Sequence, residues 1–408
     1  MEFNTALLHQ AFPCDAQTGA TLTPVYQVSA FAQSSAEQLE RVFHNQAPGF
    51  AYTRIGNPTV DAFEKRIAAL EGGIGAVACS SGMAAVTMTL LGILQAGDEV
   101  IAGTGLFGGT IDLFRDLRQL GITVRFADPV TPEQIKSLIT DKTRAVFAEL
   151  IGNPKLNVVD LEAVSAVCHE NGLPLIIDST TATPYLVRPF SFGADIVVHS
   201  ASKYINGSGS AISGILIDSG KFTWDPARYP AIAEYKKFGK FAFIARLRNG
   251  LWRNTGACLA PFNAFLNSIG LETLGLRMER ICQNALSLAE YLHRVPGMTV
   301  NYPALLQSPY YPLVQKQFGG KGGAIITLRA GSRERAFKLI NALEYALNAT
   351  NIGDVRTLVI HPASTIYAHS SQAEQEAAGV YEDTIRISVG IEDIEDLTAD
   401  FAQAIGQL

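Results

Sequence analysis

Charge, cysteine motifs and repeated segments are all scarce in this chain of 408 residues. Charged residues make up 17% of it, and 32 Lys and Arg against 38 Asp and Glu give a formal net charge of −6. No basic block suggests a surface for nucleic acid, and the acidic balance argues against one. There is no internal repeat and no low-complexity segment. The composition therefore predicts an ordinary globular protein without a nucleic-acid partner.

The cysteines are few and scattered, and no two of them form a CxxC pair. Neither a zinc site nor a disulfide framework is indicated, and we predict no metal site. Reduced thiols in a cytoplasmic protein are the simplest interpretation. The first sixteen residues also lack the basic head and apolar core of a secretory signal. The five cysteines are Cys14, Cys79, Cys168, Cys258 and Cys282.

One uncharged segment, residues 72–97, is long enough to cross a bilayer. Its centre, however, is Ser80-Ser81-Gly82, and its flanks are Glu71 and Asp98 rather than Lys or Arg. A buried strand, a polar turn and a buried helix explain this segment better. We therefore expect no membrane association.

The composition and the hydrophobic periodicity of the sequence change twice along the chain. Residues 57–253 alternate apolar strands with helical stretches, which is typical of a mostly parallel sheet covered by helices on both faces. Residues 1–56 are polar and irregular, and we expect an N-terminal arm that needs a partner to order it. Residues 254–408 turn to long helical runs with a few strands, which predicts a C-terminal α+β domain.

Two buried strands end in residues that could carry chemistry. The apolar run 196–198 leads through His199 to Lys203, and desolvation there would lower the pKa of the amine, allowing it to form a Schiff base with an aldehyde cofactor. The run 175–177 ends in Asp178, which could keep a pyridine nitrogen protonated. Both side chains would lie at the carboxyl edge of the sheet, where ligands bind. Taken singly, the lysine could instead reach solvent and the aspartate cap a helix.

Small residues suggest a phosphate site between these elements. Residues 76–79 lead into Ser80-Ser81-Gly82-Met83 and then into an apolar helical run to Leu94. Free main-chain N–H groups and the positive end of the helix dipole would bind a phosphate. The pattern alone is weak, because many helices begin with Ser-Gly.

A rival motif lies at residues 103–108, GTGLFG. It satisfies GxGxxG, follows the strand 99–102, and is followed at the end of the next strand by Asp128. Alone, it would predict a dinucleotide site of a nicotinamide-dependent enzyme. Such a domain would have no need of Lys203 or Asp178, so we favour the aldehyde cofactor.

Six motifs are spread over nearly the whole chain: 52–59 (YTRIGNPT), 80–83 (SSGM), Asn153-Pro154, Asp178, 200–203 (SASK) and 386–393 (RISVGIED). They occur in the order of a known family. The chain resembles the Cys/Met-metabolism pyridoxal-phosphate enzymes, the cystathionine γ-synthase-like group of fold type I. This resemblance implies an α/β fold with pyridoxal 5'-phosphate as the cofactor, and a retained lysine argues against a catalytically silent scaffold.

The resemblance also implies roles for individual residues toward the cofactor. Lys203 would carry it as a Schiff base and then move protons as the catalytic residue, while Asp178 would pair with the pyridine nitrogen. Phe107 would lie against the face of the pyridoxal ring, and Asn153 would bind its phenolic oxygen or the substrate carboxylate. The phosphate ligands expected are Ser81, Gly82, Met83, Ser200 and Ser202.

The remaining roles concern the substrate and a neighbouring subunit. Tyr52 and Arg54 would reach the cofactor phosphate of a neighbour, with Tyr52 also a catalytic candidate, which implies a homotetramer of two dimers that share active sites. Arg386 would bind the α-carboxylate of an amino-acid substrate, with Asn351 beside it. Glu149 could bind the distal end of the substrate or serve a structural role. Without the resemblance, Arg54 would be a solvated loop residue and Arg386 an edge-strand residue facing water.

Within the family the likeness is closest to O-acetylhomoserine sulfhydrylases, carried by residues 151–158, 220–224, 351–354 and 359–365. It implies γ-replacement on O-acetyl-L-homoserine by a sulfur nucleophile, giving L-homocysteine and acetate in methionine biosynthesis. A sulfur carrier protein is a further candidate partner.

Phe107 stands where most of the family has a tyrosine. It keeps the stacking but removes a hydroxyl that could protonate a leaving group. Acetate leaves readily as the anion, whereas a thiolate leaving group needs more help, so Phe107 favours an acyl-homoserine substrate. The alternatives are an O-succinylhomoserine sulfhydrylase, some of which also carry Phe there, and a methionine or cystathionine γ-lyase.

Overall fold

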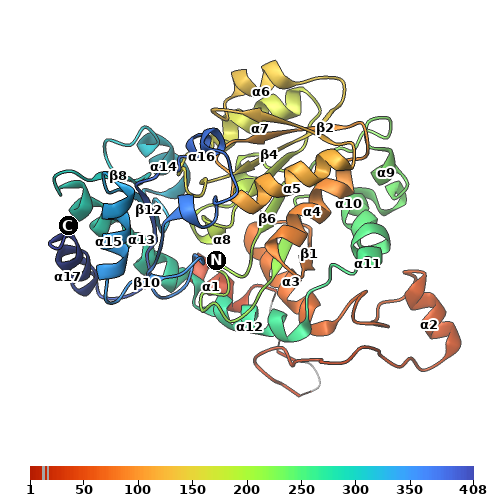
Figure 1. Cartoon of the computed structure of the whole chain (residues 1–408). Helices are drawn as coiled ribbons and strands as arrows, with labels where there is room; N and C mark the ends of the chain where they lie inside the picture. The colour runs from red at the N-terminus through yellow and green to blue at the C-terminus, as the bar shows by residue number, and fades with distance from the viewer. Residues whose placement is uncertain (12–13, 16–17) are drawn as a thin grey trace.

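The computed structural model describes residues 1–11, 14–15 and 18–408 and contains two separate sheets with an N-terminal arm (Figure 1). The larger sheet has seven strands in the order β1-β7-β6-β5-β4-β2-β3. All pair in parallel except β7, which is antiparallel to both of its neighbours. The strands are β1 (Gly75–Cys79), β2 (Glu99–Gly103), β3 (Thr123–Ala127), β4 (Thr143–Glu149), β5 (Leu175–Asp178), β6 (Ile196–His199) and β7 (Gly214–Asp218).

Helices cover both faces of this sheet, because its strands are apolar on both sides. Adjacent residues of β5 belong to different cores: Ile176 packs with α4 and α5, and Ile177 packs with α3 and α7. The mostly parallel, doubly covered sheet predicted from the sequence is thus confirmed. The helices are α3 (Pro58–Glu71), α4 (Gly82–Ile93), α5 (Gly108–Gln119), α6 (Pro132–Leu138), α7 (Leu161–Glu170), α8 (Thr183–Leu186), α9 (Pro230–Ala233), α10 (Ala242–Arg246), α11 (Trp252–Thr255) and α12 (Pro261–Glu272), with the short turns η1 (Pro189–Phe192), η2 (Lys236–Phe241) and η3 (Leu247–Leu251).

The second sheet has the order β10-β11-β12-β9-β8 and is flanked by the long helix α13 (Leu274–His293). Its central strand β12 (Thr384–Ser388) is buried at all five positions, whereas the sequence predicted burial of alternate side chains only. The difference arises because Ile385 and Ile387 lie in the main hydrophobic core, while Arg386, between them in the strand, contacts Asn153 in the loop after β4 of the larger sheet. The other elements are β8 (Thr299–Asn301), β9 (Ile325–Arg329), β10 (Leu347–Asn348), β11 (Leu358–Ile360), α14 (Tyr311–Phe318), α15 (Arg333–Ala342), η4 (Pro362–Ser364), α16 (Gln372–Ala377) and α17 (Ile394–Ile405).

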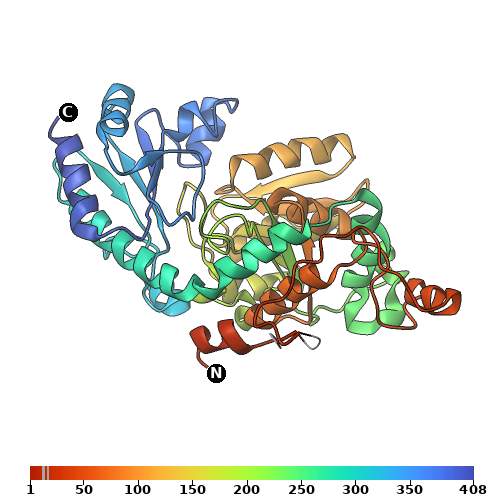
Figure 2. The same ribbon diagram turned by 90° about the horizontal axis from the view of Figure 1, so that it is seen from below.

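The N-terminal arm is more ordered than its sequence suggested. Its first helix, α1 (Phe3–His9), packs against α3 and α13, and the Leu7 carbonyl accepts a hydrogen bond from buried Arg66. The second helix, α2 (Ala36–Phe43), has no buried residue and lies at the end of an extended stretch away from both sheets (Figure 1, Figure 2). The described residues of the arm outside these two helices form turns and extended chain.

The segment that contained the candidate membrane span folds as β1, a polar turn and α4. In the part of the chain that the structure describes, no helix is both long and apolar enough to span a bilayer.

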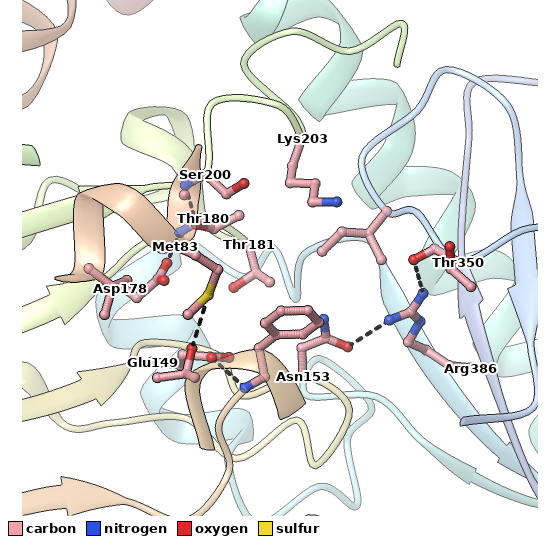
Figure 3. Close-up of a pocket in the computed structure, with 15 residues that line it drawn as sticks. Met83, Glu149, Asn153, Asp178, Thr180, Thr181, Ser200, Lys203, Thr350 and Arg386 are labelled. Carbon is pink, nitrogen blue, oxygen red and sulfur yellow. Dashed lines mark hydrogen bonds between the residues drawn. The ribbon is translucent and has the colours of Figure 1, made fainter. Parts of the chain in front are cut away.

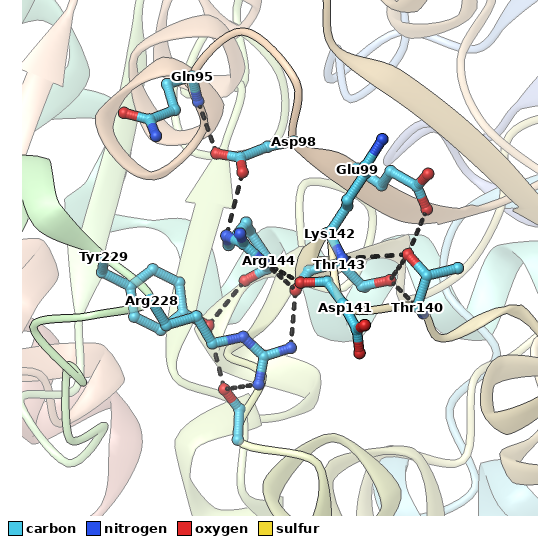
Figure 4. A network of polar contacts seen from close by, with 11 residues as sticks. Gln95, Asp98, Glu99, Thr140, Asp141, Lys142, Thr143, Arg144, Arg228 and Tyr229 are labelled. Carbon is cyan, nitrogen blue, oxygen red and sulfur yellow. Dashed lines mark hydrogen bonds and ion pairs between the residues drawn. The ribbon is translucent and has the colours of Figure 1, made fainter.

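A network of hydrogen bonds lies at the amino end of the larger sheet, opposite to the carboxyl ends of its parallel strands (Figure 4). The Arg228 guanidinium donates to the main-chain carbonyls of Asn171 at 2.6 Å and Thr143 at 2.7 Å. The hydroxyl of buried Tyr229 donates to the Gly172 carbonyl at 3.0 Å. These contacts satisfy carbonyls at the start of β4 and in the α7–β5 turn.

Candidate active site

The carboxyl edge of β4, β5 and β6 and the second sheet enclose a pocket of about 640 Å³, including space open to solvent. Lys203, Asp178 and Arg386 approach it from three sides (Figure 3). Tyr52, Arg54, Ser81, Ser202 and Asn351 do not line it. The predicted residues that do line it are Gly82, Met83, Phe107, Glu149, Asn153, Asp178, Ser200, Lys203 and Arg386.

Lys203 lies in the turn after β6, and its Nζ donates to Asn351 Oδ1 at 2.6 Å. Burial, with a smaller contribution from the charge of Arg386, lowers the pKa of the lysine to about 8. The loop that carries Asn351 packs tightly on this turn, because a Cβ on Gly353 (φ +72°) would lie 2.6 Å from the Tyr204 nitrogen. The structure therefore holds in place an amine that loses its proton more easily than an ordinary lysine.

Arg386 lies on β12 and is 2% exposed. Its Nη2 donates to the Asn351 carbonyl at 3.0 Å, and its Nη1 contacts Asn153 Oδ1 at 3.4 Å, while its Nε has no partner among the described residues. No described carboxylate forms an ion pair with it, and burial lowers its pKa to about 10. A buried guanidinium with unused donors that borders a cavity is a receptor for an anion.

The start of α4 forms the third polar feature of the pocket. Ser81 is the N-cap, and its Oγ accepts from the Ala84 N–H at 3.1 Å. A Cβ on Gly82 would lie only 2.5 Å from the Ser200 Cβ, so glycine is required for the helix to approach the β6 turn this closely. The first N–H groups of the helix have no acceptor within it and lie beside the Ser200 hydroxyl, an arrangement that suits a phosphate.

Ser202, predicted beside Ser200, is directed elsewhere. Its Oγ donates to the Ser213 carbonyl at 2.9 Å and accepts from the Ser213 N–H at 2.8 Å. The hydroxyl therefore joins the lysine turn to β7 in this structure.

Two carboxyl groups lie side by side at the sheet edge, because Glu149 and Asp178 are register partners on β4 and β5. Burial raises the pKa of both, and the neighbouring Asp178 raises that of Glu149 further. The Thr180 N–H, which donates to Asp178 Oδ1 at 2.9 Å, and the more distant His199 oppose the rise at Asp178. The pKa of Glu149 is raised well above its usual value and the Thr180 hydrogen bonds limit the rise at Asp178, so of the two carboxyl groups Glu149 retains a proton more readily.

Glu149 also has a structural contact that the sequence left open. Its Oε1 accepts from the Phe107 N–H at 2.5 Å. Phe107 stands at the start of α5 with its side chain 37% exposed on the pocket. Glu149 therefore fixes the main chain from which this ring projects.

The sequence analysis missed Thr180 and Thr181, which line the pocket together with Ile352. Thr180 Oγ1 accepts from the Ser200 N–H at 2.8 Å and so joins the ends of β5 and β6. The threonines directly after Asp178 were the available signal for these two residues.

Tyr52 and Arg54 lie outside the pocket of their own chain. The Arg54 guanidinium stacks over the Tyr52 ring at 5.5 Å and donates to the Arg253 carbonyl at 2.7 Å. Tyr52 is 42% exposed. Both side chains are therefore on a surface that another subunit could meet.

The GxGxxG glycines serve packing within the protein. A Cβ on Gly105 would lie 1.9 Å from Asn157 Oδ1, and one on Gly108 would lie 2.8 Å from the Ile366 carbonyl. Asp128, the acidic residue of the rival motif, pairs with Lys155 at 2.8 Å. The space that a dinucleotide would need at this loop is filled by the chain itself.

Comparison with known proteins agrees with this geometry. The model of the Cys/Met metabolism PLP-dependent enzyme family matches residues 4–406. Homocysteine synthase of Schizosaccharomyces pombe is 42% identical over 99% of this chain and 98% of its own length. O-acetyl-L-homoserine sulfhydrylase 1 of Thermus thermophilus is 41% identical over 99% of this chain and 100% of its own.

Solved structures agree in the fold. A Campylobacter jejuni protein described as an O-acetylhomoserine (thiol)-lyase superposes with a TM-score of 0.96 at 34% identity, with 100% of both chains covered, and it contains N'-pyridoxyl-lysine-5'-monophosphate. Cystathionine gamma-lyase of Lactobacillus plantarum gives a TM-score of 0.87 at 31% identity, covering 100% of this chain and 99% of its own. The prediction of pyridoxal phosphate as the cofactor is confirmed.

The lowered pKa of Lys203 predicts when its amine becomes reactive. Cofactor-free protein, mixed with pyridoxal phosphate and trapped with borohydride, should be labelled faster as the pH rises through about 8, because the free amine is the nucleophile. The initial labelling rate against pH, with peptide mapping, measures this, and Lys203→Arg is the control that should remain unlabelled. A rise that begins only near the pKa of an ordinary lysine, or labelling at another lysine, would contradict the assignment.

Proposed function

The chain belongs to the Cys/Met metabolism PLP-dependent enzyme family, and from this premise we propose that it is an O-acetylhomoserine sulfhydrylase. The reaction replaces the acetoxy group of O-acetyl-L-homoserine with sulfide and gives L-homocysteine and acetate, a step of methionine biosynthesis. Full-length relatives with this named activity support the proposal. The observation that carries it is the pairing of Lys203 and Arg386 in one cavity, an amine and a carboxylate receptor.

The pocket suits each part of pyridoxal phosphate. The phosphate would bind at the start of α4 beside Ser200, the ring nitrogen would face Asp178, and the ring face would meet Phe107. Lys203 would hold the aldehyde carbon. When bound, the cofactor supplies a sink for the electron pair released next to the substrate amino group.

The α-carboxylate of the substrate would bind Arg386. Its guanidinium presents unused donors to the pocket, and Asn153 and Asn351 fix it from two sides. A planar guanidinium binds a carboxylate in a defined orientation. This orientation would turn the substrate Cα toward Lys203.

Lys203 would then move protons at two carbons. It removes the proton at Cα and a proton at Cβ, acetate leaves Cγ with the bonding pair, hydrosulfide adds to Cγ, and protons return to Cβ and Cα. A pKa of about 8 lets the same amine accept and donate near neutral pH. Asn351 would hold the amine over the substrate through its 2.6 Å hydrogen bond.

The charges around the pocket favour an acetyl ester over a succinyl ester. Among the described residues that line it, the cationic side chains are Lys203 and Arg386, and both already have roles. The second carboxylate of a succinyl ester would have no cation left to pair with in this partly enclosed pocket. Phe107 offers no acid to a basic leaving group, which disfavours lysis of methionine or cystathionine.

These charges predict how kcat/KM differs among the candidate substrates. With sulfide, kcat/KM should be at least roughly tenfold higher for O-acetyl- than for O-succinyl-homoserine, and L-cystathionine or L-methionine should be cleaved slowly. Phe107→Tyr should raise cleavage more than acetyl replacement, since general-acid help is worth about 10²–10⁴-fold. Steady-state kinetics of all four substrates in both variants checks this. If the wild type cleaves cystathionine as fast as it consumes O-acetylhomoserine, the γ-lyase alternative holds. A higher kcat/KM for the succinyl ester would instead favour an O-succinylhomoserine sulfhydrylase.

We further propose a cytoplasmic homotetramer built from dimers that share active sites. All five cysteines are free thiols, which suits a reducing compartment. The exposed Tyr52 and Arg54 and the unburied α2 suit contact with a second copy. Sulfide is the proposed donor, and a sulfur carrier protein is the alternative.

A shared site predicts complementation between two inactive chains. Mixed oligomers of Arg54→Ala and Lys203→Ala should regain part of the activity, because one site then combines an intact Lys203 with an intact Arg54 from its neighbour. Activity after co-refolding, with mixed assembly verified by differently tagged chains, measures this. Verified mixed oligomers that recover nothing would exclude a site shared through Arg54.

A further inference from the structure

One segment of the second sheet's domain reaches across to the loop that carries Phe107. Residues 361–381 follow β11 and include η4 and α16. Four of them, Ala363, Tyr367, Ala378 and Val380, form a small buried cluster with Ile111 of α5, separate from the two main cores. Figure 1 shows α16 on the side of the second sheet that faces α5.

Two contacts fix this segment against α5 and its preceding loop. Arg115 of α5 pairs with Glu374 of α16 at 2.6 Å. At the loop itself, the Ile366 carbonyl lies so close to Gly108 that an added Cβ would approach it to 2.8 Å. Only glycine at position 108 permits this approach.

Tyr367 makes the contact nearest to the pocket. Its side chain is 1% exposed, and its hydroxyl donates to the main-chain carbonyl of Leu106 at 2.8 Å. Burial raises the pKa of this phenol, so it stays a neutral donor at any working pH. Tyr367 does not line the pocket itself.

Leu106 and Phe107 are therefore held from opposite sides at successive residues. Tyr367 binds the carbonyl of Leu106, and Glu149 of β4 binds the N–H of Phe107. These two groups belong to one planar peptide unit, so the two hydrogen bonds fix the orientation of that peptide and with it the point from which the Phe107 side chain projects. Removing either anchor would leave a loop free to shift and a buried polar group unpaired.

Residues 361–381 also connect the Tyr367 hydrogen bond to the strand next to Arg386. Residues 361–367 continue directly from β11, whose Ile360 is the register partner of Arg386 on β12. A single stretch of chain thus links the strand beside Arg386 to the ring of Phe107.

We propose that Tyr367 is a positioning residue that aims the Phe107 ring at the cofactor, so that the domain carrying Arg386 also sets the stacking of the pyridoxal ring. The proposal rests on the cofactor site of the proposed function and is independent of the substrate.

The test compares Tyr367→Phe with Tyr229→Phe, a matched control. Both remove one buried hydroxyl that donates to main-chain carbonyl oxygen, but Tyr229 lies at the opposite edge of the sheet. Tyr367→Phe should change the visible circular dichroism of bound pyridoxal phosphate and raise its Kd by roughly 2- to 10-fold, the range of one hydrogen bond. Tyr229→Phe should leave both readouts unchanged, whatever it does to the Tm.

A double variant tests whether Tyr367 acts on cofactor binding through the Phe107 ring. In Phe107→Ala protein, adding Tyr367→Phe should change the Kd little further, because the ring it aims is gone. Equal effects of Tyr367→Phe with and without the ring, or an unchanged dichroism in the presence of the ring, would overturn the proposal. Both measurements use no amino-acid substrate, so inactivity toward O-acetylhomoserine would refute the proposed function without touching this result.

Discussion

Asn351 joins the two cations of the pocket, and the geometry of the site depends on that junction. Its side-chain oxygen accepts from Lys203 at 2.6 Å, and its main-chain carbonyl accepts from Arg386 at 3.0 Å. Lys203 belongs to the turn after β6, and Arg386 belongs to β12 of the other sheet. A base can act on a substrate whose carboxylate is held only if these two groups keep a fixed separation. The loop at Gly353, packed without a Cβ against the lysine turn, maintains it.

Burial shifts the pKa values of the pocket groups in different directions. It lowers the pKa of Lys203 to about 8, so the amine keeps most of its charge at neutral pH but loses its proton more easily than an ordinary lysine. It raises the pKa of Glu149, whereas a pKa of about 10 keeps Arg386 charged at neutral pH. The result is a cavity lined by two cationic side chains and the positive end of α4. The phosphate and the carboxylate of the proposed ligands would balance this arrangement. The charge pattern thus accounts for both ligands of the proposed reaction.

Much of the site was predictable because it lies at the ends of consecutive parallel strands. Asp178 and Lys203 each follow a short apolar run, and the carboxyl ends of such strands meet at one edge. Contacts across the two sheets were not predictable in this way. Asn351 and Tyr367 lie far from their partners in sequence, with 148 residues separating Lys203 from Asn351 and 261 separating Leu106 from Tyr367. The alternating pattern of β12 likewise gave no sign that both of its faces would be buried. The proposed place of Arg54 in a neighbour's site depends on a contact between two chains.

The proposed role of Lys203 at two carbons is tested most directly by running the sulfide reaction with O-acetylhomoserine in deuterium oxide. Since one amine exchanges protons with solvent and returns them to both positions, the homocysteine formed should carry deuterium at Cα and at Cβ, as read by proton NMR and mass spectrometry. Homocysteine labelled at Cα alone, or not labelled, would contradict replacement at Cγ through successive proton removal by this lysine.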